Sequence, residues 1–169
     1  MDHPRALTPQ DAEAYCALRR EMLLDTPHAF LGAPGDDRPS DVAFVRDQLT
    51  QAEMATFAID DPEGDGLLSV ATIMRMGRTK QRHRAMIVAV YTTPRGRGRG
   101  LGRAVVQACI DHARMWSGVE IVMLSASADA EGAVRLYERM GFERWGVEPD
   151  AIRVDGTPHD EVHLLLRLS

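Results

Sequence analysis

PRGRGRGLGR, residues 94–103, is the stretch that decides the fold. It lies between an apolar run that ends at Tyr91 and an amphipathic run that begins at Arg103. This order predicts a strand, a glycine-rich turn and the start of a helix. Pro94 lacks the N–H donor that a strand ladder needs, so it helps to end the strand before the turn.

A turn of this kind is suited to bind an anion. The first turn of a helix exposes N–H groups without intrahelical partners, and the helix dipole places partial positive charge there, so phosphates bind readily. Alternate residues of the turn lack a Cβ, which lets the backbone adopt positive φ and approach a ligand closely. These residues are Gly98, Gly100 and Gly102. Between and after them stand arginines, whose guanidinium groups suit phosphate oxygens. These are Arg97, Arg99 and Arg103.

The common nucleotide-binding loops do not match this turn. It lacks the Gly-Lys-Ser/Thr ending of a P-loop, and its glycines do not have the spacing of a dinucleotide fingerprint. The Arg-Gly alternation is also found in RNA-binding segments, but those usually bind as disordered tails. This segment lies between predicted ordered elements, and the chain carries a net charge of −5, so a nucleic-acid partner is not expected.

The spacing Arg97-x-x-Gly100-x-Gly102 resembles motif A of the GNAT superfamily of N-acetyltransferases. In that family the loop grips the pyrophosphate of acetyl-CoA, and the pantetheine arm pairs with the preceding strand. The resemblance implies that acetyl-CoA is the cosubstrate. The implied cofactor-binding residues are Tyr91, Thr92, Arg97, Gly98, Arg99, Gly100, Leu101, Gly102 and Arg103.

A second block supports the same resemblance. The apolar run 121–124 is followed by Leu136-Tyr137-Glu138-Arg139-Met140-Gly141-Phe142, which is similar to motif B of the family. The resemblance implies that Tyr137 protonates the CoA thiolate as it leaves. A phenol with an ordinary pKa of ~10 is protonated at neutral pH and suits this role. The alternative is that Tyr137 is a core tyrosine on an apolar helix face.

By resemblance the reaction is direct attack of a neutral amine on the acetyl thioester, and the implied acceptor is an amine of a small molecule or peptide. Many relatives place a glutamate on the central strand as the general base, but residues 86–90 carry no carboxylate. The alternative bases are Glu148, Glu161, His83 and His163. The sequence also has Ala130 where many relatives have an asparagine. Both departures leave open a catalytically silent CoA-binding module, while Asp129 is expected to cap the next helix.

Two further features receive structural interpretations. The pattern His159-Asp160-Glu161-Val162-His163 lacks the glutamate that follows the first histidine of a zinc helix and lies in a predicted strand, so no metal site is expected. Cys109 lies within the apolar helix after motif A and is expected to serve packing rather than carry an acyl group.

Length and composition predict one N-acetyltransferase domain over residues 1–169. The chain is 44% hydrophobic and long enough for one sizeable core. Its two cysteines, the absence of a secretory h-region and the absence of long apolar runs predict a cytoplasmic protein without a membrane segment. Homodimers are common in the family, so a homodimer through the last strand is expected by analogy.

The expected fold class is α/β of the GNAT type, with a mixed, mostly antiparallel sheet of six or seven strands, about four helices and splayed central strands. Strands are expected at 5–7, 54–59, 67–76, 83–92, 119–125 and in the closing region 146–168. Thr8 with Pro9 predicts the start of a helix to about Leu24, and Ser40 is the expected cap of a second helix to about Gln51. The third helix follows the glycine turn with Val106, Ile110, Ala113 and Met115 or Trp116 as its apolar stripe, and the fourth carries Tyr137.

Overall fold

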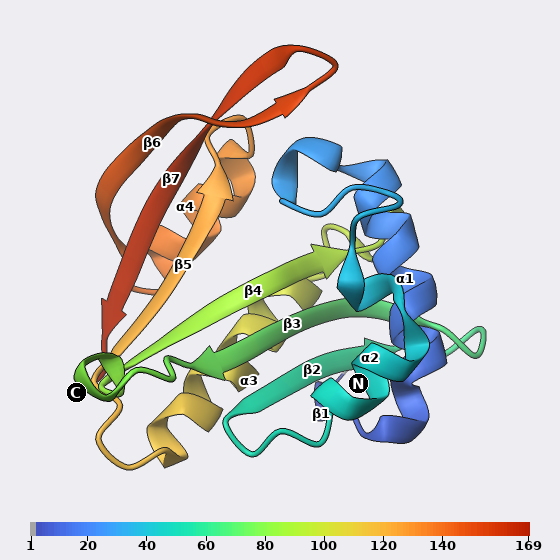
Figure 1. Ribbon diagram of the computed structural model, residues 1–169, viewed down its shortest axis with the longest axis horizontal. Helices are drawn as coiled ribbons and strands as arrows, with labels where there is room; N and C mark the ends of the chain where they lie inside the picture. The colour runs from blue at the N-terminus through green and yellow to red at the C-terminus, as the bar shows by residue number, and fades with distance from the viewer. Residues whose placement is uncertain (1–2) are drawn as a thin grey trace.

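The strands form one seven-stranded sheet in the computed structural model, which describes residues 3–169 (Figure 1). In chain order the strands and α-helices are β1 (Arg5–Ala6), α1 (Ala12–Asp25), α2 (Val42–Gln48), β2 (Met54–Asp60), β3 (Leu67–Arg75), β4 (Arg84–Thr92), α3 (Leu101–Met115), β5 (Ile121–Ser127), α4 (Glu131–Arg139), β6 (Glu143–Val154) and β7 (Thr157–Arg167). The strand order is β1-β2-β3-β4-β5-β7-β6. This mixed sheet with four α-helices in the described residues confirms the predicted fold class.

The central strands separate in the middle of the sheet. The β4 and β5 strands form the parallel pair, and they pair only where Arg84–Met86 lies beside Ile121–Met123. Beyond Met86 the two strands diverge, as Figure 1 shows. The edge of β4 that faces β5 therefore offers backbone N–H and C=O groups without a strand partner.

A bulge in β4 lies next to this opening. Ala89 and Val90 stand opposite the single residue Ala71 of β3, and Ala89 has φ of 54°. A non-glycine residue in the left-handed region carries backbone strain, and a bulge bends its strand. The bulge therefore changes the direction of β4 where it has left β5.

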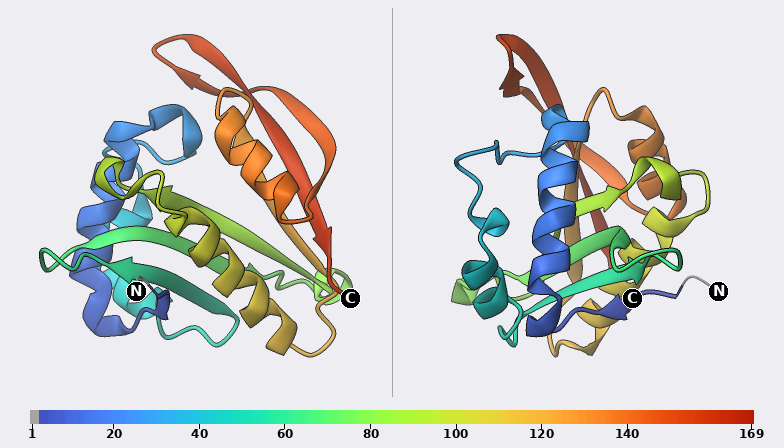
Figure 2. Two further views of the ribbon diagram at one scale, coloured as in Figure 1. Left: turned by 180° about the vertical axis from the view of Figure 1, so that it is seen from behind. Right: turned by 90° about the vertical axis from the view of Figure 1, so that its right-hand side faces the viewer.

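The helices cover both faces of the sheet and bury two apolar cores. The α1 and α2 helices pack on one face and the α3 and α4 helices on the other (Figures 1 and 2). The β3 strand lies between these layers, so all its residues from Leu67 to Ile73 are buried. The predicted inward residues of the first helix, Cys16, Leu18 and Met22, are buried. None of the helices in residues 3–169 has the length and apolar character that crossing a bilayer requires.

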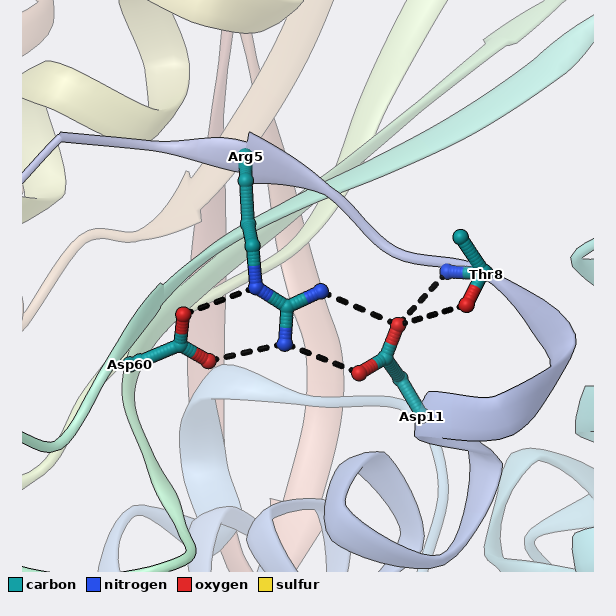
Figure 3. Close-up of polar contacts among 4 residues, drawn as sticks. All are labelled: Arg5, Thr8, Asp11 and Asp60. Atoms are coloured by element: carbon teal, nitrogen blue, oxygen red, sulfur yellow. Dashed lines mark hydrogen bonds and ion pairs between the residues drawn. The ribbon is translucent and has the colours of Figure 1, made fainter.

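A network of ionic hydrogen bonds fixes β1 and the turn after it against β2 (Figure 3). The Arg5 guanidinium donates to Asp60 at 2.7 Å and to both carboxylate oxygens of Asp11 at 2.8 and 3.0 Å. The Asp11 carboxylate also accepts from the N–H and hydroxyl of Thr8. These bonds to Arg5 hold the pKa of Asp11 down to about 2. The network supports the 3₁₀ turn Pro9–Asp11 that leads into α1 after the predicted cap at Thr8.

Two local predictions were wrong. Asp41, not Ser40, caps α2 by accepting from the Phe44 N–H at 2.7 Å, while the Ser40 hydroxyl donates to Asp37. Asp129 does not cap α4, because its carboxylate pairs with His159 at 2.5 Å and no side chain caps that helix. Of the two residues expected to end the apolar stripe of the third helix, Trp116, directly after α3, packs on the core, and Met115 is 74% exposed.

Candidate functional site

The glycine-rich turn connects β4 to α3 through positions that only glycine adopts easily. Gly98 and Gly100 have φ of 76° and 78°, and Gly100 is the N-cap of α3. A Cβ at either position would meet no atom within 4 Å, so the backbone faces open space. The first intrahelical hydrogen bond is donated by Ala104 to Gly100, which leaves the N–H groups of Leu101, Gly102 and Arg103 without helical partners. The turn thus has the geometry of an anion cradle.

Thr92 supports this turn from the end of β4. A Cβ on Gly102 would lie 3.4 Å from the Thr92 hydroxyl oxygen, and one on Gly96 would lie 3.1 Å from the Thr92 methyl group. The hydroxyl groups of Thr92 and Ser69 are hydrogen bonded at 2.8 Å. The absence of side chains at these glycines therefore lets the helix start pack directly on the strand.

The arginines of the turn have different surroundings. Arg97 is bound to the Thr92 carbonyl at 3.2 Å and pairs with Asp25, the last residue of α1. It thereby ties the turn to β4 and to α1. Arg99 and Arg103 are exposed on the turn and the first turn of α3.

The Tyr91 side chain points toward α1 and not along the turn. It is buried, and its hydroxyl lies 3.0 Å from Glu21 and 3.1 Å from Asp25. Burial and these two carboxylates raise the pKa of Tyr91 above its ordinary value. The contribution predicted for Tyr91 thus rests on its backbone.

A cavity of about 320 Å³ lies between the diverging strands. Its walls come from β4 and β5, with α4 at one end and with α1 and the loop after it at the other. The lining residues from the strands are Thr72, Met74, Met86–Val90, Ser125–Ser127 and Glu161; α4 and its start contribute Ala130, Ala133 and Tyr137; α1, α2 and the loop between them contribute Tyr15, Arg19, Ala29–Gly32, Pro39 and Gln48. Because α1 and α4 cover opposite faces, the cavity joins the two faces through the sheet.

Tyr137 lines this cavity from α4. Its ring is buried and packs edge to face on Phe142, with centroids 6.0 Å apart. Its hydroxyl makes no hydrogen bond with any residue from 3 to 169. Burial raises the pKa of Tyr137 above its usual ~10. The side chain is therefore a neutral phenol with a donor available in the cavity.

Glu161 is the carboxylate that lines the cavity among the residues described. It enters from β7, and the Ser125 hydroxyl of β5 donates to it at 2.8 Å. His163 and Glu148 lie next to it, 3.1 Å from each other, and one ligand atom from each of the three residues lies within 4.8 Å of the others. Three of the four candidate bases are thus brought together. The fourth, His83, precedes β4 at the end where β4 and β5 still pair.

The remaining candidates lie as follows. Ala130 lines the cavity, and its methyl group cannot replace an asparagine donor. Cys109, a residue of α3, is fully buried in the core, and burial raises the pKa of its thiol. His159 is part of β7, as predicted for the segment that contains it.

The sequence patterns did not identify Arg19, the charged side chain at the α1 end of the cavity. Arg19 is buried, lines the cavity and forms an ion pair with Asp37. The available signal was its position three residues after Cys16 and three before Met22, both of which were placed on the inner face of the helix. Asp37 gave no such signal because it lies in an irregular loop.

Known proteins resemble this chain in sequence. A model described as the acetyltransferase (GNAT) family matches residues 15–142. The N-alpha-acetyltransferase RimI of Mycobacterium tuberculosis is 30% identical over 151 residues, which are 89% of this chain and 84% of that protein. The mycothiol acetyltransferase of Kocuria rhizophila is 45% identical over 62 residues, which are 37% of this chain. This match covers only 20% of the length of that mycothiol acetyltransferase.

Solved structures share the fold. An acetyltransferase of the GNAT family from Streptococcus pneumoniae superposes with a TM-score of 0.85 at 20% identity, over 98% of both chains. The acetyltransferase yncA of Salmonella typhimurium, solved with acetyl-CoA, has a TM-score of 0.82 at 19% identity, over 98% of this chain and 93% of that one. At these identities the likeness concerns the fold.

Proposed function

Because the chain belongs to the GNAT family of acetyltransferases, we propose that it transfers the acetyl group of acetyl-CoA to a primary amine by direct nucleophilic attack. The observation that carries this proposal is the cavity between β4 and β5. The cavity connects two faces of the sheet. The glycine turn opens on one face, and α1 covers the other. A donor and an acceptor approaching from the two faces would meet inside it.

The residues of the turn fit the cofactor. Open space lies beside Gly98 and Gly100, and the unpartnered N–H groups at the start of α3 suit the oxygens of a pyrophosphate. The open edge of β4 near Tyr91 and Thr92 offers backbone groups for the pantetheine arm. Bound there, acetyl-CoA supplies an activated acetyl thioester. A backbone N–H of this edge would stabilise the negative charge that develops on the thioester oxygen.

Tyr137 is the proposed acid. Its hydroxyl faces the cavity without a competing partner, and burial keeps it protonated at neutral pH. It would donate its proton to the leaving thiolate and thereby remove the charge that builds up on sulfur.

Glu161 is the proposed base. Its carboxylate lines the cavity and is oriented by the Ser125 hydroxyl. An amine is mostly protonated at neutral pH, so a carboxylate in the cavity would first attract the ammonium and then accept a proton. This position on β7 compensates for the absence of a carboxylate on β4 from Met86 to Val90.

A catalytically silent CoA-binding module is the alternative function. Ala130 favours it, because a side chain without a donor there removes one polar contact from the cavity. Both functions require the glycine turn to bind CoA, and only the first requires Tyr137 and Glu161.

Calorimetric titration of acetyl-CoA into wild type, Gly100→Trp and Gly156→Trp tests the proposal. The two glycines have φ of 78° and 79° and open space beside them, so both variants carry the same backbone strain. Only the first places an indole over the cradle, and we expect only the first to lose binding. An acetyl-transfer assay on a panel of amines, run on the same preparations, completes the test. Turnover supports the enzyme, binding without turnover supports the silent module, and no binding by wild type contradicts both.

A further inference from the structure

Arg19 is held in one orientation at the α1 end of the cavity. Its Nε and Nη2 atoms donate to the two carboxylate oxygens of Asp37 at 2.9 and 2.7 Å. Its guanidinium carbon lies 5.6 Å from the centre of the Phe30 ring. The two side chains of the pair are only 10% and 3% exposed. A bidentate pair of this kind fixes the plane of the guanidinium group.

The surrounding loop leaves room for this ion pair. A Cβ at Gly32 would lie 2.0 Å from a carboxylate oxygen of Asp37 and 3.2 Å from Nη2 of Arg19. The Ser40 hydroxyl donates to the same carboxylate at 2.6 Å. A glycine and a serine thus accommodate the pair from both sides. Burying an ion pair contributes little to stability compared with apolar residues of similar size, so stability alone does not account for this arrangement.

One end of the guanidinium has a weak partner. The Nη1 atom of Arg19 donates to the thioether sulfur of Met22 at 3.5 Å. Sulfur is a poor acceptor, and an arginine carries five N–H donors. An oxygen atom entering the cavity would therefore be a better partner for Nη1 of Arg19 than the sulfur of Met22.

The charges in the cavity limit what this oxygen can be. Asp37, which does not itself line the cavity, balances the charge of Arg19, so Arg19, Asp37 and Glu161 together carry one net negative charge. Such a cavity favours a ligand with a positive charge and a neutral oxygen. It disfavours a second carboxylate, which would be left without a balancing cation.

We propose that Arg19 determines acceptor specificity by hydrogen bonding a neutral carbonyl oxygen next to the reactive amine. The acceptor class is then the α-amino amide, as at the first residue of a peptide, rather than a free amino acid or a plain alkylamine. This inference rests on the proposed function. The lining also includes the apolar residues Phe30, Leu31 and Met86, which suit an aliphatic side chain.

Three acceptors with the same side chain test the inference: leucinamide, leucine and 3-methylbutylamine. They carry an amide, a carboxylate or a hydrogen at the carbon beside the amine. Because this group also changes the pKa of the amine, every kcat/KM is expressed per concentration of neutral amine. We expect wild type to acetylate leucinamide with a kcat/KM about 10- to 100-fold above the other two, the effect of one hydrogen bond to a charged donor.

The Arg19→Gln variant separates recognition from a structural role. We expect its preference for leucinamide over 3-methylbutylamine to fall to near one through a higher KM for leucinamide. The Kd of acetyl-CoA should stay as in wild type, and the kcat/KM for 3-methylbutylamine, which has no oxygen for Arg19 to bind, should fall much less than that for leucinamide. Arg20→Gln, at the exposed neighbouring position, is the matched control and should keep the preference. An equal loss with all acceptors in Arg19→Gln would assign the residue a structural role and overturn the inference.

The wild-type acceptor series decides the question even where the variant does not fold. Equal rates with the three acceptors, or preference for leucine, would overturn the role of Arg19 and leave the proposed function standing. No turnover with any acceptor, despite acetyl-CoA binding, would overturn the proposed function and this inference with it.

Discussion

Replacing Tyr137 with phenylalanine removes one hydroxyl group from the cavity and nothing else. That hydroxyl has no hydrogen-bond partner within residues 3–169, while the ring packs on Phe142. The substitution therefore leaves no orphaned donor or acceptor behind. We expect the free energy of unfolding to change by less than about 0.5 kcal/mol.

The effect on catalysis should be far larger. A positioned general acid contributes about 10²- to 10⁴-fold to a rate, which corresponds to about 3 to 5.5 kcal/mol in activation free energy. The turn that holds the pyrophosphate is untouched, so the Kd of acetyl-CoA should change by less than about twofold. Because burial raises the pKa of Tyr137 above ~10, the wild-type rate should show no loss of this acid between pH 7 and about pH 9.5.

Steady-state kinetics with the best acceptor, calorimetry with acetyl-CoA and urea unfolding measure these quantities. A kcat within threefold of wild type would refute the acid role and return Tyr137 to a packing function. A large loss of stability together with activity would refute the assignment of an unpartnered hydroxyl.

Three further outcomes are expected. Since Arg5 lowers the pKa of Asp11 to about 2, the stabilising contribution of Asp11 is complete above about pH 4 and is lost as the pH falls toward 2. The pair is partly exposed, so Asp11→Asn should cost about 1 kcal/mol in urea unfolding at pH 7 and much less at pH 2; equal costs at both pH values would contradict this. Glu161→Gln should lower kcat/KM by about 100-fold or more at pH 7 with an unchanged Kd for acetyl-CoA, and a loss under fivefold would exclude it as the base. The buried thiols of Cys16 and Cys109 should react with a thiol reagent only after unfolding, and rapid labelling of the native protein would show that the helices open.

Local sequence signals predicted the parts of the fold that depend on backbone chemistry. The alternating glycines predicted the turn after β4, and the structure gives Gly98 and Gly100 the positive φ values that only glycine adopts without strain. Alternation of apolar and polar residues, together with continuous apolar runs, located the strands to within a few residues. The separation of β4 and β5 followed from the family resemblance, because no residue pattern within either strand marks it.

Such local signals did not predict contacts between residues that are distant in the chain. Asp129 had the residue type and position of a helix cap, but His159, 30 residues away, binds its carboxylate. The bulge at Ala89 lies in an apolar run without glycine, so no local sequence feature predicted it. Among the four candidate bases, Glu161 is the one that lines the cavity, because the pairing of β5 with β7 sets it opposite Ser127 and within hydrogen-bond distance of Ser125.

The most direct measurement is a crystal structure of the protein with CoA and leucinamide. We expect pyrophosphate density at the backbone N–H groups of residues 98–103 and the sulfur atom inside the cavity between β4 and β5, within reach of the Tyr137 hydroxyl. We also expect the leucinamide amine on the Glu161 side of that cavity. CoA bound away from the turn, or a cavity closed to both ligands, would contradict the central claim.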